Sequence, residues 1–343
     1  MNKACELCQS DEYINFVRTD AKTNVQLNLI YCSSCSLVQQ KDLPSDAELN
    51  LYYSHNYRHD YKGTYTPKTK YIYRAGLAAL NRIKFLESAI GVSHQTLLDI
   101  GAGGGEFVYL ANKRGFSAKG IEPNVGYSEF SQEQYEVEVQ TTILSELENS
   151  SADILTMFHV FEHMANPHDV IRKLYSIVKN NGYLFIEVPN ILQADSSPHN
   201  IYFKAHLFYY SRFTLNSLAS GYFDLIKADD TGNLKMLFKK KSIPTQKVTL
   251  PNTEECQIAK NRMRKKGWFE YLFIGGGILK PFLRIEKLIA ESLVNKKSPR
   301  QILDDLYNKR HRYSTTHSIR NIQRLGCWTG FGGIGFLCFE VFC

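Results

Sequence analysis

The fold of this 343-residue chain is decided by the stretch Leu97-Leu98-Asp99-Ile100-Gly101-Ala102-Gly103-Gly104-Gly105-Glu106-Phe107. A short apolar run ends in an acid, a glycine-dense turn follows, and a helical pattern begins. This is how a parallel strand passes to the N-terminus of a helix in a nucleotide-binding α/β fold. The glycines let the backbone approach a ligand closely, and the acid at the strand end can receive a positively charged or hydroxyl-bearing ligand group.

The glycine spacing excludes two common nucleotide sites. A dinucleotide fingerprint that starts at Gly101 would need glycine at position 106, where Glu106 stands, and no Gly-Lys-Ser/Thr follows to make a P-loop. The pattern is instead Asp-x-Gly-x-Gly-x-Gly, and it resembles the first motif of class I S-adenosylmethionine-dependent methyltransferases. The resemblance implies that the cofactor contacts Asp99, Gly101, Ala102, Gly103 and Gly105.

The segments that follow support this resemblance. The apolar residues 118–121 end in Glu122-Pro123, about twenty residues beyond the loop, where such folds bind a ribose through a carboxylate. Residues 152–163 predict a buried strand with a polar edge, 167–181 predict a helix, and 183–190 predict the next strand. Together these elements extend the resemblance over residues 75–241 and imply a doubly wound, Rossmann-like α/β sheet. Three further side chains are expected at the cofactor: Thr142, Phe158 and His159.

Two Cys-x-x-Cys pairs near the N-terminus, separated by 23 residues, predict a metal site. Four thiolates from Cys5, Cys8, Cys32 and Cys35 can surround one tetrahedral zinc ion and leave no position open for water, which favours structural zinc. A redox dithiol is the competing interpretation, but no βαβ pattern surrounds the pairs. A module this small would take much of its folding free energy from the metal.

The charge distribution favours a phosphate-bearing small molecule over nucleic acid. The net charge is +7, but residues 1–241 hold 24 basic and 26 acidic residues, while 242–312 hold 15 and 7. A nucleic-acid partner would favour a basic face on the zinc module itself. The N-terminus has no basic region followed by an apolar run, so we expect a cytoplasmic chain with reduced cysteines.

Composition divides the chain into four regions. We expect a zinc-binding module at 1–45, a tyrosine-rich connector at 46–74, the methyltransferase domain at 75–241, and a basic, mostly helical C-terminal extension at 242–343. The connector, with Tyr57 as a candidate cofactor contact, is either a cap over the active site or a packing strap between domains. Within the extension, residues 260–295 are basic and amphipathic. They either contact an anionic membrane surface or pack as a helical subdomain on the core.

The chain combines a zinc module, a tyrosine-rich connector and a methyltransferase core. This combination is similar to that of the bacterial deoxysugar C-methyltransferases, which act on nucleotide-linked sugars. It also resembles the wider set of zinc-module methyltransferases from surface-polysaccharide and antibiotic pathways. The deoxysugar enzymes carry Tyr-Asp-Glu-His after strand 5, where this chain reads Phe203-Lys204-Ala205-His206. Only the histidine is kept. Carbon alkylation needs more polar groups than remain, so we expect an oxygen acceptor in carbohydrate biosynthesis.

An oxygen nucleophile needs a general base, and histidine titrates in the useful range. His206 is the first candidate, and His163 with Glu162 at the end of strand 4 is the second. Polar packing is the alternative for all three residues. Two other functions stay open: a nucleic-acid methyltransferase guided by its zinc module, and a cofactor-binding scaffold without catalysis.

Overall fold

The computed structural model describes residues 4–44, 67–92 and 94–309. The chain divides into two compact units, Met1–Leu303 and Asp304–Cys343. The fold and the sites described below belong to the first unit.

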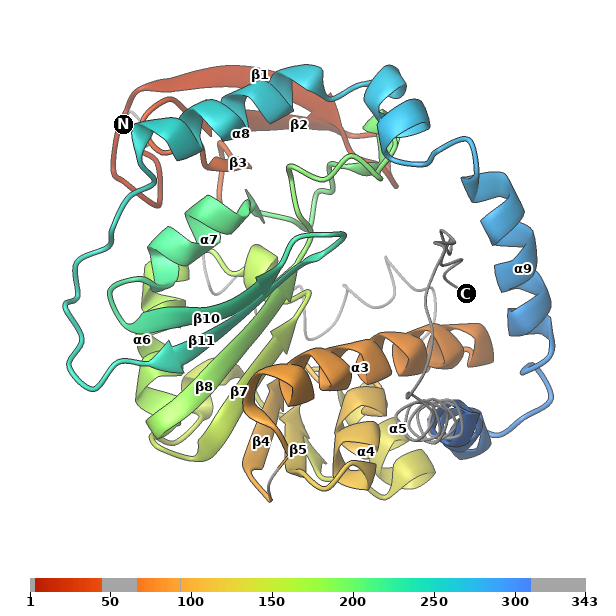
Figure 1. Ribbon diagram of the computed structural model, residues 1–343. Helices are drawn as coiled ribbons and strands as arrows, with labels where there is room; N and C mark the ends of the chain where they lie inside the picture. Colours follow the sequence, from red (N-terminus) through yellow and green to blue (C-terminus); the bar gives the residue numbers. More distant parts are fainter. Residues whose placement is uncertain (1–3, 45–66, 93, 310–343) are drawn as a thin grey trace, which may run out of the picture. The chain divides into compact units, whose positions relative to one another are not determined.

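A seven-stranded sheet with the order β10-β11-β8-β7-β4-β5-β6 forms the centre of the first unit (Figure 1). Neighbouring strands from β8 through β6 are parallel, whereas β11 pairs antiparallel with both β8 and β10. The strands are β4 Thr96–Ile100, β5 Ser117–Ile121, β6 Val139–Gln140, β7 Ala152–Phe158, β8 Val178–Val188, β10 Phe223–Asp229 and β11 Leu234–Lys240. This topology confirms the predicted Rossmann-like class I methyltransferase fold.

Helices cover both faces of this sheet, because its central strands are apolar on both sides. In Figure 1, α3 (Thr69–Ile90), α4 (Glu106–Lys113) and α5 (Val125–Tyr135) lie on one side, and α6 (Pro167–Ile177) and α7 (Arg212–Ala219) lie on the other. Short 3₁₀ turns join some of these elements: η2 Leu144–Glu146, η3 Phe161–His163 and η4 Pro198–Asn200.

One predicted helix boundary is wrong. The helix expected over 167–181 ends at Ile177, because β8 begins at Val178, which pairs with Ala152 of β7. Gly182 allows this close approach, since a Cβ there would lie 2.6 Å from the carbonyl oxygen of Asp153. Helix α3 begins at Thr69, inside the expected connector.

The N-terminal region forms a separate antiparallel sheet with the order β1-β2-β3-β9. Its first three strands are β1 Tyr13–Thr19, β2 Gln26–Cys32 and β3 Val38–Gln40. The fourth, β9 Phe208–Tyr209, comes from the loop that follows β8 of the central sheet. One strand of the methyltransferase domain therefore completes the sheet of the cysteine module.

The C-terminal extension begins with α8 (Thr253–Lys265), continues through a π-helical turn, η5 (Glu270–Ile274), and leads into α9 (Lys280–Ser292). Residues 299–309 are also helical. Pro281 occupies the first turn of α9, where proline is tolerated because that amide has no helical partner. Across the described ranges, no helix combines the length and apolarity needed to cross a membrane.

Candidate functional site

The glycine loop between β4 and α4 adopts a backbone that other residues rarely take. Gly101, Gly103 and Gly105 have φ angles of 76°, 57° and 83°, in the left-handed region. A Cβ on Gly101 would lie 2.5 Å from Cγ2 of Val160, and one on Gly105 would lie 2.6 Å from Cβ of Ser131. The loop therefore packs closely against its neighbours as it turns, and Gly105 caps the start of α4.

Two buried carboxylates lie at the ends of the adjacent strands β4 and β5. Glu122 accepts hydrogen bonds from the backbone N–H of Gly103 at 2.9 Å and of Asn124 at 3.2 Å. Asp99 accepts one from the hydroxyl of Thr156 at 2.6 Å, and burial raises the pKa of Asp99 to about 7. Glu122 thus ties the glycine loop to the neighbouring strand, and each carboxylate keeps lone pairs for a ligand.

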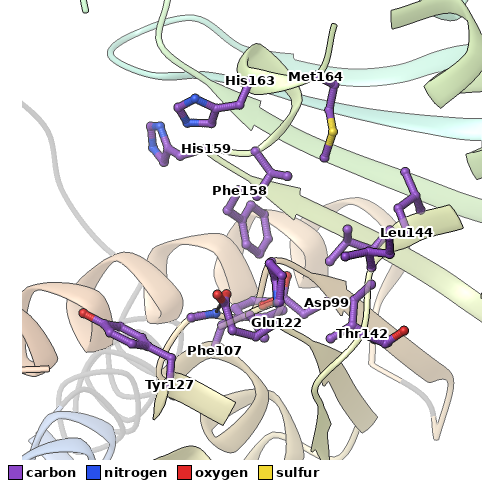
Figure 2. Close-up of a pocket in the computed structure, with 18 of the residues that line it drawn as sticks. Asp99, Phe107, Glu122, Tyr127, Thr142, Leu144, Phe158, His159, His163 and Met164 are labelled. Carbon is purple, nitrogen blue, oxygen red and sulfur yellow. Dashed lines mark hydrogen bonds between the residues drawn. The ribbon is translucent and has the colours of Figure 1, made fainter. Parts of the chain in front are cut away.

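A cavity of about 620 Å³ opens at this edge of the sheet, within the usual size range of small-molecule sites. Figure 2 shows Asp99 and Glu122 with Phe158 beside them, and His159 and His163 together farther along the wall. Of the predicted residues, the cavity is lined by Asp99, Gly101, Ala102, Gly103, Glu122, Pro123, Thr142, Phe158, His159 and His163. Gly105, Glu162 and His206 are not among the described lining residues, and Tyr57 lies outside the described part of the chain.

His159 belongs to a charged network in the cavity wall. Its backbone has a φ of 57°, which is uncommon for a residue other than glycine. Its Nδ1 lies 3.4 Å from Oε1 of Glu162 and its Nε2 lies 3.3 Å from Oε1 of Glu187. Burial alone would lower the pKa of His159, but these two carboxylates raise it to about 9. His159 is therefore a cation near neutral pH.

Arg82 completes this network from helix α3. Its guanidinium binds both carboxylate oxygens of Glu187, at 2.9 and 3.2 Å, and lies 4.2 Å from the ring centroid of Phe158. Burial raises the pKa of Glu187, but His159 and Arg82 outweigh it and hold the pKa well below its usual range. Sequence reasoning missed both Arg82 and Glu187, because neither lies in a recognisable motif and they meet only through the fold.

A second cluster contains Glu162, His163 and His206. The Nδ1 of His163 donates to the carbonyl oxygen of Ala205 at 2.7 Å, and its Nε2 lies 4.0 Å from Oε1 of Glu162. Burial raises the pKa of Glu162, but the imidazoles lower it to about 2. One ligand atom from each of the three residues lies within 4.8 Å of the others, so the set has donors of the kind that hold a cation.

His206 lies next to His163 and is intermediate in exposure, whereas His163 is buried. The two ring centroids are 5.1 Å apart, and burial together with His163 lowers the pKa of His206 to about 3. Within the described residues, Nδ1 of His206 has no hydrogen-bond partner. The structure thus places the second sequence candidate for the base, His163, in the cavity wall, whereas the first, His206, is not among the described lining residues.

The four cysteines of the N-terminal module come together as predicted. The sulfur atoms of Cys5 and Cys35 are 3.5 Å apart, as are those of Cys8 and Cys32, and all four lie within 4.8 Å of one another. Tetrahedral zinc at about 2.3 Å from each sulfur would separate the sulfurs by about 3.8 Å. None of the four is in a disulfide. The donor set and its spacing fit one structural zinc ion.

The cysteine module holds the segment that carries His206. β3 pairs with β9, and the side-chain amide of Gln40 donates to the carbonyl oxygens of Lys204 and His206 at 2.8 Å each. Asp20 accepts from the backbone N–H of Lys204. The module is therefore connected to the wall of the cavity through Ala205, whose carbonyl orients His163.

Comparisons with known proteins agree with this fold. Residues 71–222 match the family model described as a methyltransferase domain, which confirms the predicted class I S-adenosylmethionine-dependent methyltransferase domain. Ubiquinone biosynthesis O-methyltransferases of Pseudomonas putida (strain W619) and Pseudomonas paraeruginosa (strain DSM 24068 / PA7) are 27% and 29% identical over 117 residues. The alignments cover 32% of this chain and 50% of each relative, so the chain spans about half the length of the curated relatives it matches.

Solved structures with a similar domain include two methyltransferases. The 1,6-didemethyltoxoflavin-N1-methyltransferase of Burkholderia thailandensis is 14% identical with a TM-score of 0.46, and the match covers 60% of this chain and 96% of that one. The magnesium protoporphyrin IX methyltransferase of Synechocystis PCC 6803 is 12% identical with a TM-score of 0.44, covering 58% and 99%.

Proposed function

We propose that this chain transfers a methyl group from S-adenosylmethionine to an oxygen atom of a small molecule, and that the acceptor is a sugar or nucleotide-linked sugar. One observation carries the reaction type: the cavity joins a glycine loop and two carboxylates to a histidine in its wall, His163. The similarity to O-methyltransferases supports an oxygen acceptor. The four-cysteine module, through its resemblance to the sugar enzymes, supports the sugar.

The glycine loop, Asp99 and Glu122 would hold S-adenosylmethionine. When bound, it supplies an electrophilic methyl group on a sulfonium sulfur. Glu122, already anchored by two backbone N–H groups, has lone pairs left for the two ribose hydroxyls. Asp99 offers a carboxylate to a positively charged group. The loop itself leaves no room for side chains at Gly101, so the ligand meets backbone there.

We assign the general base to His163 rather than to His206. His163 lines the cavity, and because its Nδ1–H donates to the carbonyl oxygen of Ala205, we assign Nε2 as the nitrogen that accepts the proton. As the acceptor oxygen bonds to the methyl carbon and the carbon–sulfur bond breaks, the hydroxyl proton passes to Nε2 of His163. The Glu162 carboxylate, 4.0 Å away, stabilises the imidazolium that forms. His206, with its lowered pKa, is a weaker base and is not a described lining residue.

The test compares three single variants on a panel of nucleotide sugars, with S-adenosylhomocysteine formation as the readout. We expect His163→Ala to reduce turnover by about 10²–10⁴-fold, the usual share of a general base. Titration calorimetry should show unchanged S-adenosylmethionine affinity. His199→Ala is the matched control, because His199 lies on η4, outside the described lining. Full turnover by His163→Ala, with a loss in His206→Ala, would return the role to His206.

We further propose one structural zinc ion per chain, bound by the four cysteines. The zinc ion would stabilise the module that carries β3 and Gln40, and these in turn hold the 204–206 segment. Elemental analysis of the purified chain gives the metal and its stoichiometry. A metal content unchanged in a Cys32→Ser/Cys35→Ser variant would contradict the assigned ligands.

A further inference from the structure

Helix α9 exposes one apolar side along its length. Phe282, Ile285, Ile289 and Leu293 recur every three or four residues and so share a face of the helix. Their exposed fractions are 68%, 57%, 57% and 71%. We call these four residues the α9 apolar face. Soluble proteins rarely leave such a group of large side chains uncovered, so it marks an interaction surface.

The opposite side of α9 attaches the helix to the methyltransferase domain. Glu291 is buried and receives two hydrogen bonds from the guanidinium of Arg74 on α3, at 2.6 and 2.8 Å. Arg284 and Lys287 lie seven and four residues before Glu291, on the same side of the helix. Figure 1 shows α9 beside the end of α3 that this ion pair joins. Because the polar side is anchored to α3, the apolar face points away from it.

The surroundings of α9 are strongly basic. Residues 260–300 contain eleven lysines and arginines and three acids. Two of the acids are buried in ion pairs: Glu291 with Arg74, and Glu270 with Arg262 at 2.9 Å. The third, Glu286, is exposed. The segment therefore presents far more positive than negative charge to a partner.

We propose that the α9 apolar face inserts into the surface of an anionic phospholipid bilayer, with the basic side chains of 260–300 at the headgroups. An amphipathic helix with a basic polar side is the element that lies in such an interface. The charge argues for lipid rather than for a second copy of the chain, which would bring a second basic segment against the first. Two aromatic side chains of the preceding turn, Phe269 and Phe273, are also exposed, at 73% and 63%, and would add to the contact.

The helix that anchors α9 also contributes to the cavity, and this links the proposed membrane contact to the proposed function, on which this step rests. Arg74, which anchors α9, lies between Tyr71 and Ala75, and both of these residues line the cavity. The helix that attaches the membrane-binding element is therefore also a wall of the site. An acceptor carried by a membrane lipid would be presented near this wall.

The test measures co-sedimentation of the full chain with vesicles, without S-adenosylmethionine. We expect binding to vesicles that contain phosphatidylglycerol, much weaker binding to pure phosphatidylcholine, and release at 1 M salt, where charges are screened within about 3 Å. Phe282→Ser/Ile289→Ser should weaken binding by about tenfold or more, because insertion depends on buried apolar area. The matched control is Ile14→Ser/Val17→Ser on β1, which changes two side chains of similar exposure, 56% and 51%.

Tryptophan fluorescence locates the contact directly. The chain has two tryptophans, so Trp328→Phe leaves Trp268, which is 50% exposed next to Phe269, as the reporter. We expect its emission to shift to the blue on anionic vesicles and to be quenched by brominated lipids. No vesicle binding, or equal losses in both double variants, would overturn the proposal. So would a dimer that Phe282→Ser/Ile289→Ser dissociates, since a second copy would then cover the face. Because no methyl transfer is measured, failure here leaves the proposed function untouched.

Discussion

Replacing Gly101 by alanine should cost the domain measurable stability through two separable effects. The residue has a φ of 76°, and the left-handed backbone costs a residue with a Cβ about 1–2 kcal/mol. The new Cβ would also lie 2.5 Å from Cγ2 of Val160, and overpacking of this kind costs about 1–3 kcal/mol. Valine is stiff at χ1, so Val160 cannot easily turn away. We expect Gly101→Ala to lower the free energy of unfolding by about 2–5 kcal/mol.

Denaturant unfolding of Gly101→Ala, Gly115→Ala, Val160→Ala and the double variant Gly101→Ala/Val160→Ala separates the backbone cost from the cost of the close contact. Gly115→Ala is the matched control, because Gly115 has a φ of 98° but its nearest contact would be 3.7 Å away, so only the backbone cost applies. Val160→Ala removes the clashing methyl groups and should restore part of the stability of Gly101→Ala. We therefore expect a coupling free energy of about 1 kcal/mol or more between positions 101 and 160. Equal losses in Gly101→Ala and Gly115→Ala, with additive effects of Val160→Ala, would refute the close-contact reasoning.

Three further outcomes follow from the site. Because the pKa of Asp99 is about 7, its carboxylate is protonated below that pH, so S-adenosylmethionine affinity measured by calorimetry should be full above pH 7 and fall toward pH 5. In Asp99→Asn that pH dependence should disappear. Glu122→Gln should weaken cofactor binding by about 1.5–3 kcal/mol, since one of two backbone N–H groups loses its charged acceptor; unchanged affinity would exclude this role. Cys8→Ser/Cys35→Ser should lower the metal content and raise hydrogen exchange at 202–209, because β9 loses a stable partner strand; protection at the wild-type level would contradict the proposed mechanical link.

Features that depend on a few neighbouring residues could be predicted from the sequence. The glycine loop needs left-handed backbone at fixed positions, and only glycine supplies it cheaply. The two Cys-x-x-Cys pairs converge in the structure because each pair already spans the geometry of one metal. The doubly wound fold class followed from the resemblance of residues 75–241. In each case the deciding information lies within a few residues.

Features that depend on distant partners could not be predicted. Arg82 and Glu187 are ordinary charged residues of a helix and a strand, and only the packing of α3 on the sheet brings them to His159. The end of α6 was misplaced for a similar reason. The helix that begins at Pro167 ends at Ile177 because Val178 pairs with Ala152 of β7, and that competition is invisible in a single segment.

The two histidines illustrate how a local motif can mislead about chemistry. His206 stood in the position of a catalytic histidine by resemblance, yet the cysteine module encloses its segment through β9 and Gln40, and burial lowers its pKa to about 3. The same β9 and Gln40 contacts hold the segment whose Ala205 carbonyl accepts from Nδ1 of His163, a residue that lines the cavity. The 204–206 segment, whose own histidine would be a poor base, is thus well suited to orient His163. On this geometry the metal module would influence methyl transfer at a distance, through the tautomer of a histidine that it does not touch.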